Sequence, residues 1–161
     1  MSRFSFIMLK KKYHALSAYL SVFSNPLDIL KFRNLRRNNV KTIQSPVYFR
    51  IKGAGNHTLK CRPGSTDHGV LWQTFYHKYH IPPFPLAKNS IIVDLGSNVG
   101  YTMVHLATLY PDAQVYGVEM DYENFLIAKE NISFLGDRCK IIHAAVWNKD
   151  GEIFYSGQEA N

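Results

Sequence analysis

The stretch Ile91-Ile92-Val93-Asp94-Leu95-Gly96-Ser97-Asn98-Val99-Gly100-Tyr101 decides the fold of this chain. It begins with an apolar, β-branched run, which is typical of a buried strand, and apolar residues then recur at helical spacing from Val99 to Tyr110. Gly96 and Gly100 lie between the two patterns. Glycine lets the backbone approach a ligand closely, and the start of a helix presents free N–H groups to polar ligand atoms. The order of strand, glycine turn and helix therefore predicts a nucleotide-cofactor site.

An acidic residue ends the second predicted strand, which covers residues 114–119. This acid, Glu119, follows Gly96 by 23 positions. The interval is close to the offset of about 20 residues at which a carboxylate binds the ribose hydroxyls of a nucleotide. Glu119 is therefore the candidate ribose ligand.

The glycine loop differs from the dinucleotide fingerprint G-x-G-x-x-G, because the residues between Gly96 and Gly100 include no glycine. Asp94, near the end of the first strand, would repel a diphosphate and attract an ammonium group. S-adenosylmethionine carries an ammonium group, a sulfonium and a ribose, and it has no phosphate. The pattern therefore favours this methyl donor over NAD, although the glycine loop alone also fits an NAD-binding Rossmann protein.

Several segments, taken together in their order and spacing, resemble the FkbM-type family of S-adenosylmethionine-dependent methyltransferases. They are Arg62-Pro63-Gly64-Ser65-Thr66-Asp67, Val-Asp-Leu-Gly-Ser-Asn-Val-Gly-Tyr (93–101), Val-Glu-Met-Asp-Tyr-Glu-Asn-Phe (118–125), Lys-Glu-Asn (129–131) and Ala-Ala-Val-Trp-Asn-Lys-Asp-Gly (144–151). The resemblance covers roughly residues 60 to 157. It implies a class I, Rossmann-like domain that binds S-adenosyl-L-methionine and methylates a hydroxyl of a sugar, a glycan or a natural product.

The resemblance also implies roles for individual residues. Those that would line the methionine end of the cofactor are Asp94, Gly96, Ser97, Asn98 and Gly100. Glu119 would bind the ribose, Met120 would pack on the adenine, and His143 and Ala144 would form the rim where the base is read. The ring of Tyr101 would either shape the methionine pocket or pack against the sheet. No residue stands out as the general base that a hydroxyl acceptor requires, so the catalytic residues stay unassigned.

Alternating strands and helices predict an α/β fold with a parallel sheet. The expected order is strand 90–95, helix 99–109, strand 114–119, helix 122–135 and strand 139–146, with Asp121 capping the second helix and Gly136-Asp137 ending it in a left-handed turn. A turn at 148–151 and a strand at 152–155 would follow. Upstream we expect helices over 5–23 and 27–37, a hairpin of strands 47–51 and 58–61, and a helix over 66–79 that Thr66 or Asp67 would cap.

The predicted organisation has two parts. Residues 1–60 form a basic helical extension with a β-hairpin, and residues 61–161 form an FkbM-like methyltransferase domain. Domains of that family normally continue past the third strand, so the resemblance implies that 61–161 would correspond to the N-terminal half of the domain and would be C-terminally incomplete. An open apolar sheet edge would result, which a second copy or a partner chain would complete. The alternative is a catalytically inactive fragment that acts as a binding module.

The positive charge is concentrated in the first part of the chain. Residues 1–60 hold twelve Lys and Arg and one acid, a formal charge of +11, whereas residues 61–161 hold seven Lys and Arg and eleven acids, a charge of −4. A basic arm of this kind is typical of contact with an anionic membrane or a nucleic acid, or it is a solvated positive face. Because the chain has no nucleic-acid recognition signature, we expect a peripheral membrane contact through residues 1–40 and no nucleic acid.

Cys61 and Cys139 are far apart in the chain and form no C-x-x-C pair, so neither a zinc site nor a disulfide framework is indicated. No acid or cysteine completes a metal site with His77 and His80. No apolar run approaches the roughly 20 residues that span a bilayer, and nothing has the order of a secretory signal. We therefore expect a cytoplasmic protein with reduced thiols and no metal.

Overall fold

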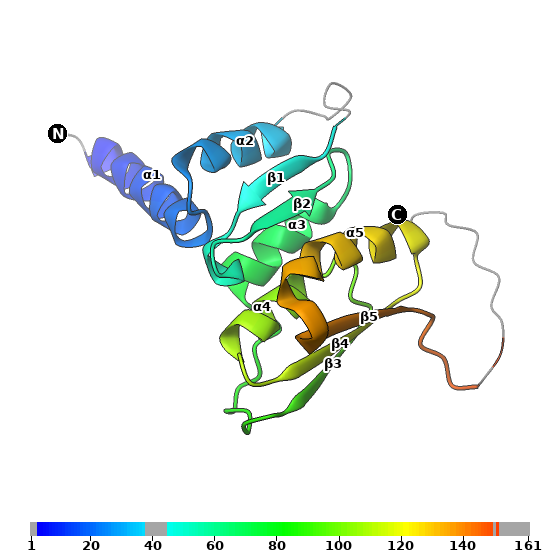
Figure 1. Cartoon of the computed structure of the whole chain (residues 1–161). Coiled ribbons are helices and arrows are strands. Elements are labelled where there is room, and N and C mark those ends of the chain that lie inside the picture. Colours follow the sequence, from blue (N-terminus) through cyan, green and yellow to red (C-terminus); the bar gives the residue numbers. More distant parts are fainter. Residues whose placement is uncertain (1–2, 38–44, 150, 152–161) are drawn as a thin grey trace. The chain divides into compact units, whose positions relative to one another are not determined.

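The computed structural model describes residues 3–37, 45–149 and 151, and the chain forms two compact units, Met1–His80 and Ile81–Asn161 (Figure 1). The predicted division after residue 60 falls inside the first unit. The reason is a helix after residue 61 that packs on the N-terminal helix, where the rings of Trp72 and Tyr19 lie 5.1 Å apart. That residues 61–161 form a methyltransferase domain stays a prediction.

Helices and a hairpin build the first unit. Its elements are α1 (Arg3–Val22), α2 (Pro26–Arg37), the antiparallel strands β1 (Val47–Arg50) and β2 (Thr58–Cys61), and α3 (Asp67–Trp72), which continues as a π-helical turn, η2 (Gln73–His77). Pro26 starts α2, where its missing N–H is harmless, and Asn25 Oδ1 accepts a hydrogen bond from the Leu27 N–H at 3.0 Å. The two predicted N-terminal helices and the hairpin are confirmed.

Aromatic rings form the core of the first unit. Phe23, Phe32 and Phe49 are buried and contact one another with ring centroids 5.0, 5.6 and 5.7 Å apart. Trp72 stacks on Phe32 at 5.7 Å. Because each such pair contributes about 0.5–1.5 kcal/mol beyond its buried area, this cluster joins α1, α2, β1 and α3 into one unit.

The helix predicted over 66–79 is shorter in the structure, ending at His77, and its predicted cap is wrong. Thr66 makes no side-chain capping hydrogen bond. The fully buried carboxylate of Asp67 instead accepts hydrogen bonds from Arg62: from Nε at 3.0 Å, from Nη2 at 2.8 Å and from the backbone N–H at 2.8 Å. A guanidinium offers two charge-assisted donors in one plane, which a single helix N–H cannot match.

The second unit alternates strands and helices. Its elements are β3 (Ile91–Leu95), α4 (Tyr101–Leu109), β4 (Gln114–Glu119), α5 (Tyr122–Ile132), a 3-10 helix η3 (Ser133–Arg138) and β5 (Cys139–His143). The strands are parallel in the order β3-β4-β5, which is the order of one βαβαβ half of a Rossmann-like sheet. The predicted α/β class with a parallel sheet is confirmed, and β4 has the predicted bounds.

Both helices of this unit cover the same face of the sheet (Figure 1). Paired residues of parallel strands point to one face, so the pairs Asp94↔Gly117 and Glu119↔His143 lie on the face that carries the buried Val115. The opposite face is apolar and exposed, with Ile91, Val93, Leu95 and Ile142 all more than half exposed. That a second copy or a partner chain completes this sheet stays a prediction.

Two predicted element ends are wrong. Helix α5 stops at Ile132, and the chain tightens into η3 before it reaches Gly136. Gly136 has φ 60° and ψ −142°, so it lies outside the left-handed helical region that the predicted cap requires. Strand β5 ends at His143, three residues before its predicted end. The strand predicted over 152–155 lies outside the described residues.

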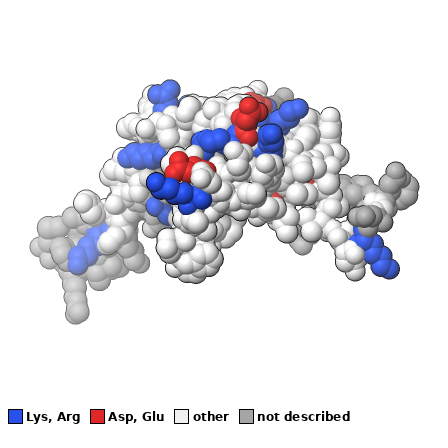
Figure 2. Space-filling view, turned by 60° about the horizontal axis from the view of Figure 1, so that its bottom comes forward, with Lys and Arg blue, Asp and Glu red and all other residues white. Residues whose placement is uncertain are grey.

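Charges of both signs are mixed on the face drawn in Figure 2, where acidic side chains lie beside Lys and Arg and much of the surface is uncharged. Helix α1 spans 20 residues without a break, but a run of three lysines, 10–12, interrupts its apolar sequence. Within the described parts of the chain, no helix has both the length and the apolar character needed to cross a membrane.

Candidate functional site

The glycine loop between β3 and α4 is a tight turn that main-chain hydrogen bonds hold against β4. Gly96 and Gly100 have φ values of 81° and 79°, which glycine tolerates best. The N–H groups of Gly96 and Ser97 donate to the Val118 carbonyl oxygen at 2.9 and 3.0 Å. Ser97 Oγ donates to the Asp94 carbonyl oxygen at 2.8 Å. The loop is therefore fixed on the neighbouring strand by the protein itself.

Asn98 also stabilises the glycine loop. It has φ 50°, and its Oδ1 accepts a hydrogen bond from the Val99 N–H at 2.7 Å. Asparagine is one of the few residues other than glycine that tolerate this backbone conformation. The side-chain oxygens of Ser97 and Asn98 thus stabilise the turn, which places the loop backbone close to any ligand at the strand ends.

Glu119 joins the glycine loop to the turn that follows β4. Its side chain is buried, with Oε2 accepting a hydrogen bond from the Asn98 N–H at 2.7 Å and Oε1 accepting one from the Asp121 N–H at 2.9 Å. Asp121 in turn caps α5, as predicted, by accepting from the Asn124 N–H at 2.8 Å. Each carboxylate oxygen can accept a second hydrogen bond, so Glu119 keeps acceptor capacity for the hydroxyls of a ligand.

Asp94 lies on β3 opposite Gly117, with most of its side chain withdrawn from solvent. Its Oδ2 is buried and accepts no hydrogen bond from any residue that the structure describes. Burial, and to a smaller extent the charge of Glu119, raise the pKa of Asp94 from 3.8 to about 6. Most buried polar atoms are hydrogen-bonded, so this oxygen is an unfilled acceptor beside a second carboxylate. A cationic N–H donor on a ligand would satisfy it.

A pocket of about 360 Å³ opens where the carboxyl ends of β3 and β4 meet the segment after β5. Its lining consists of Gly96, Glu119, Met120 and Ala144, which the sequence predicts, together with Leu95, Val118 and Val146. The last three were not among the predicted site residues. Leu95 and Val118 stand at or near strand ends, and that position was the signal that could have identified them.

Six of the predicted site residues do not line this pocket: Asp94, Ser97, Asn98, Gly100, Tyr101 and His143. His143 Nε2 donates a hydrogen bond to the Met120 carbonyl oxygen at 3.0 Å, and its ring contacts Tyr122 and Phe125 with centroids 5.2 and 5.3 Å away. It therefore stabilises the turn that carries Met120. Tyr101 is fully buried, which favours packing of its ring over direct contact with the methionine end of a cofactor.

Gly117 is a fourth residue of this region that the sequence pattern did not single out. A Cβ atom at this position would overlap Met103 Sδ and come within 2.5 Å of Ser97 Oγ. A glycine inside a strand often marks such a close approach, which was the available signal. Gly117 thus lets the glycine loop and α4 seat directly on the sheet.

Gly100→Ala should destabilise the second unit by about 2 kcal/mol, because alanine in the left-handed region costs about 1–2 kcal/mol. The new Cβ would also lie 3.1 Å from the Cα and Cβ atoms of Ala128 in α5. Urea unfolding measures the change. Gly69→Ala is the control, since Gly69 lies in α3 with no atom near a new Cβ and should gain up to about 1 kcal/mol. Equal stabilities for the two variants would contradict the tight approach of α4 to α5.

No family model matches this chain, so the FkbM type is not confirmed. By sequence, methyltransferases are among its relatives. A fibrillarin-like rRNA/tRNA 2'-O-methyltransferase from Thermoplasma volcanium is 38% identical over 42 residues, which make up 26% of this chain and 19% of that protein. The O-methyltransferase imqG from Aspergillus flavus is 34% identical over 55 residues, which make up 33% of this chain and 22% of that protein. The matches therefore span about a fifth of the length of these relatives.

Solved structures of methyltransferases also match. PKMT2 from Rickettsia typhi in complex with AdoHcy is 22% identical, with a TM-score of 0.36 over 42% of this chain and 14% of that chain. Coclaurine N-methyltransferase bound to N-methylheliamine and SAH is 14% identical, with a TM-score of 0.38 over 94% of this chain and 47% of that chain. Because both TM-scores are below 0.5, the fold is assigned from the parallel strand order β3-β4-β5 of the chain itself.

Proposed function

We propose that the second unit binds S-adenosyl-L-methionine and that the protein transfers the methyl group of this cofactor to a hydroxyl oxygen. The observation that carries the proposal is Asp94, whose buried Oδ2 lacks a hydrogen-bond donor among the described residues. An ammonium group fits this carboxylate, whereas the diphosphate of NAD would be repelled by it. The names of both sequence relatives denote O-methyltransferases, which supports oxygen as the acceptor atom.

The residues of the site fit the parts of this cofactor. When bound, S-adenosylmethionine supplies a methyl group on a positively charged sulfur. Asp94 would hold the ammonium group, Glu119 would accept hydrogen bonds from the ribose hydroxyls, and the apolar lining around Met120 would contact the adenine. Because Glu119 is already anchored on two backbone N–H groups, its oxygens are in place before the ligand arrives. Such preorganisation lowers the free-energy cost of binding.

For the acceptor, we propose a hydroxyl of a sugar, a glycan or a natural product, on the resemblance to the FkbM type. In this transfer the sulfur–methyl bond breaks, an oxygen–methyl bond forms and the hydroxyl proton passes to a base. Positioning of the two reactants supplies most of the acceleration in such an in-line displacement. We assign no base in this chain.

We also propose a cytoplasmic location. Cys61 and Cys139 are both buried and form no disulfide, which suits a reducing compartment. Mass spectrometry of the protein from its native cell, after blocking free thiols, should find both thiols modified only upon unfolding.

Isothermal titration of the full chain with S-adenosylmethionine, S-adenosylhomocysteine and NAD tests the cofactor. We expect both adenosyl ligands to bind, because both carry the ammonium group and the ribose, and we expect NAD not to bind. Binding of NAD alone would overturn the proposal. Tight binding of S-adenosylhomocysteine without methyl transfer to any hydroxyl acceptor would favour the alternative of an inactive binding module.

A further inference from the structure

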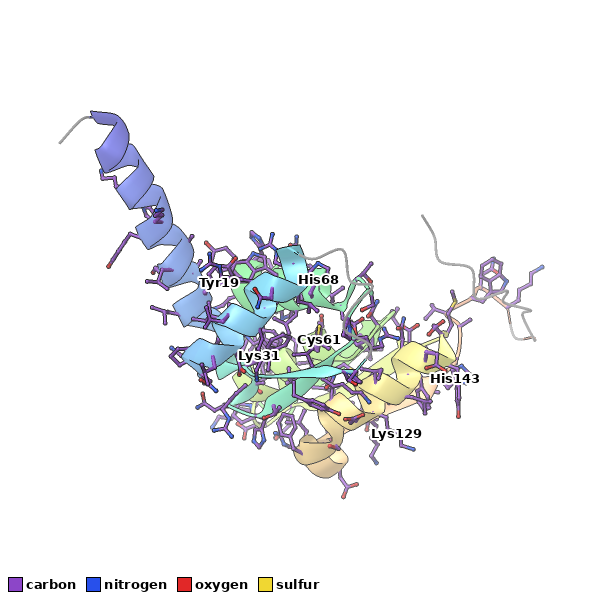
Figure 3. The ribbon with its side chains drawn as sticks, turned by 90° about the horizontal axis from the view of Figure 1, so that it is seen from above. Tyr19, Lys31, Cys61, His68, Lys129 and His143 are labelled. Atoms are coloured by element: carbon purple, nitrogen blue, oxygen red, sulfur yellow. The ribbon has the colours of Figure 1, made fainter. Side chains whose placement is uncertain are left out.

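The apolar stripe of α1 lies on the surface of the first unit. Tyr13, Leu16 and Leu20 follow one another at three- and four-residue steps, so they share one side of the helix. Their exposed fractions are 73%, 51% and 43%. The helical periodicity of α1 predicts an apolar side, but no other described element of the first unit covers it. In Figures 1 and 3, the N-terminal part of α1 extends away from α2 and the hairpin.

Helix α2 also presents leucines to solvent. Leu27 and Leu30 are 62% and 55% exposed, because Ile29, Phe32 and Leu35 supply the buried side of this helix. Four large aliphatic side chains on two consecutive helices are therefore exposed. On each helix the two leucines lie one turn apart and form a small apolar patch, and exposed apolar patches on a monomeric protein often mark a binding site.

The exposed charges on the same helices are positive. Lys10 and Lys12 lie within one turn of the α1 stripe, and Lys31 and Arg33 lie within one turn of the exposed leucines of α2. The single acid in residues 1–60, Asp28, is buried and accepts hydrogen bonds from Lys31 Nζ at 3.1 Å and from the Arg50 N–H at 2.9 Å. No acidic side chain among the described residues of α1 and α2 therefore faces the solvent.

We infer that the exposed sides of α1 and α2 form a docking surface for an anionic lipid membrane, on which the chain lies without crossing it. Leucines would enter the boundary between headgroups and acyl chains, while lysines and arginines would contact acidic headgroups. A nucleic acid would use the positive charge but would leave the four leucines in water. The combination of exposed leucine and basic residues therefore favours the membrane over nucleic acid. This surface is independent of the proposed cofactor site, whose residues all lie in the second unit.

Sedimentation of the full chain with vesicles tests the inference. We expect binding to vesicles of phosphatidylcholine mixed with phosphatidylserine, little binding to phosphatidylcholine alone, and weaker binding at high salt. Leu16→Ser with Leu27→Ser removes apolar groups, and Lys12→Glu with Arg33→Glu reverses charge. These side chains are exposed, so both double variants should fold. Each basic side chain near such a surface contributes about five-fold in affinity, so loss of two should weaken binding of the charge variant at least about 25-fold.

The matched control is Leu126→Ser with Lys129→Glu, which makes the same two kinds of change on exposed residues of α5 in the second unit (Lys129 is labelled in Figure 3). It should bind vesicles like the unchanged chain. Circular dichroism of every variant separates loss of folding from loss of binding. Equal vesicle binding by all variants would overturn the inference. The inference would also be overturned if the chain did not bind vesicles but bound an RNA oligonucleotide, with the RNA affinity lost in the charge variant and kept in the leucine variant.

Discussion

Glu119→Ala should weaken the binding of S-adenosylhomocysteine by about 100-fold, which corresponds to about 3 kcal/mol, the upper range for hydrogen bonds to a charged group. The substitution removes the proposed ribose acceptor. It also frees the N–H groups of Asn98 and Asp121, which the carboxylate oxygens of Glu119 now bind at 2.7 and 2.9 Å. Isothermal titration at constant pH measures the change in affinity.

The control for this prediction must separate ribose binding from local loosening. Asp121→Ala does so, because it removes the cap of α5 and leaves the backbone N–H that donates to Glu119. Loss of the cap should lower the free energy of unfolding by about 1 kcal/mol. The affinity for the cofactor should nevertheless stay close to that of the unchanged chain. An equal loss of affinity in both variants, or no loss in Glu119→Ala, would remove Glu119 from the ribose role.

The sequence predicts the local pattern of the second unit well because its signals are short-range. The β-branched run before Gly96 and the acid that ends the next strand mark both strand ends, and these ends set the position of the pocket. The end of α5 was harder to predict. Gly136 is typical of a helix end in the sequence, but the α-helix has already changed to a 3-10 helix at Ser133. No residue type at that point predicts the change.

Properties that depend on distant contacts were not predictable from the pattern. Helical spacing puts Leu16 and Leu20 on one side of α1, but it does not tell whether another element covers that side. Asp67 looks like a helix cap until the structure brings the Arg62 guanidinium within 2.8 Å of it. The identity of Glu119 as an acceptor could be predicted. Its two backbone partners could not, because the turn geometry of the loop decides them.

Asp94→Asn should make the protein more stable at pH 7 and should also weaken cofactor binding. Burial first, and the charge of Glu119 second, raise the pKa of Asp94 from 3.8 to about 6. The folded state therefore prefers the protonated carboxyl. This contribution to stability is fully present below pH 3.8 and is lost as the pH rises through about 6. At pH 7 the ionised side chain thus destabilises the unliganded fold, by up to about 3 kcal/mol. Asparagine keeps the shape without the charge, so urea unfolding should show a gain of about 1–3 kcal/mol.

The same substitution separates stability from function through the pH dependence of binding. In the unchanged chain, the affinity for S-adenosylhomocysteine should fall as the pH drops below about 6, because protonated Asp94 no longer attracts the ammonium group. In Asp94→Asn this fall should disappear and the affinity at pH 7 should be lower by about tenfold or more, since a charge-assisted hydrogen bond contributes about 1.5–3 kcal/mol.

The control is Asp112→Asn, which changes an exposed acid of the same unit. It should change stability by less than about 0.5 kcal/mol and leave the pH dependence of binding intact. If the variant were more stable and bound the ligand normally, the free-energy cost of ionised Asp94 would be unrelated to ligand binding. A gain in stability together with a flat pH profile would instead show that Asp94 binds the ligand at a cost in the stability of the unliganded fold.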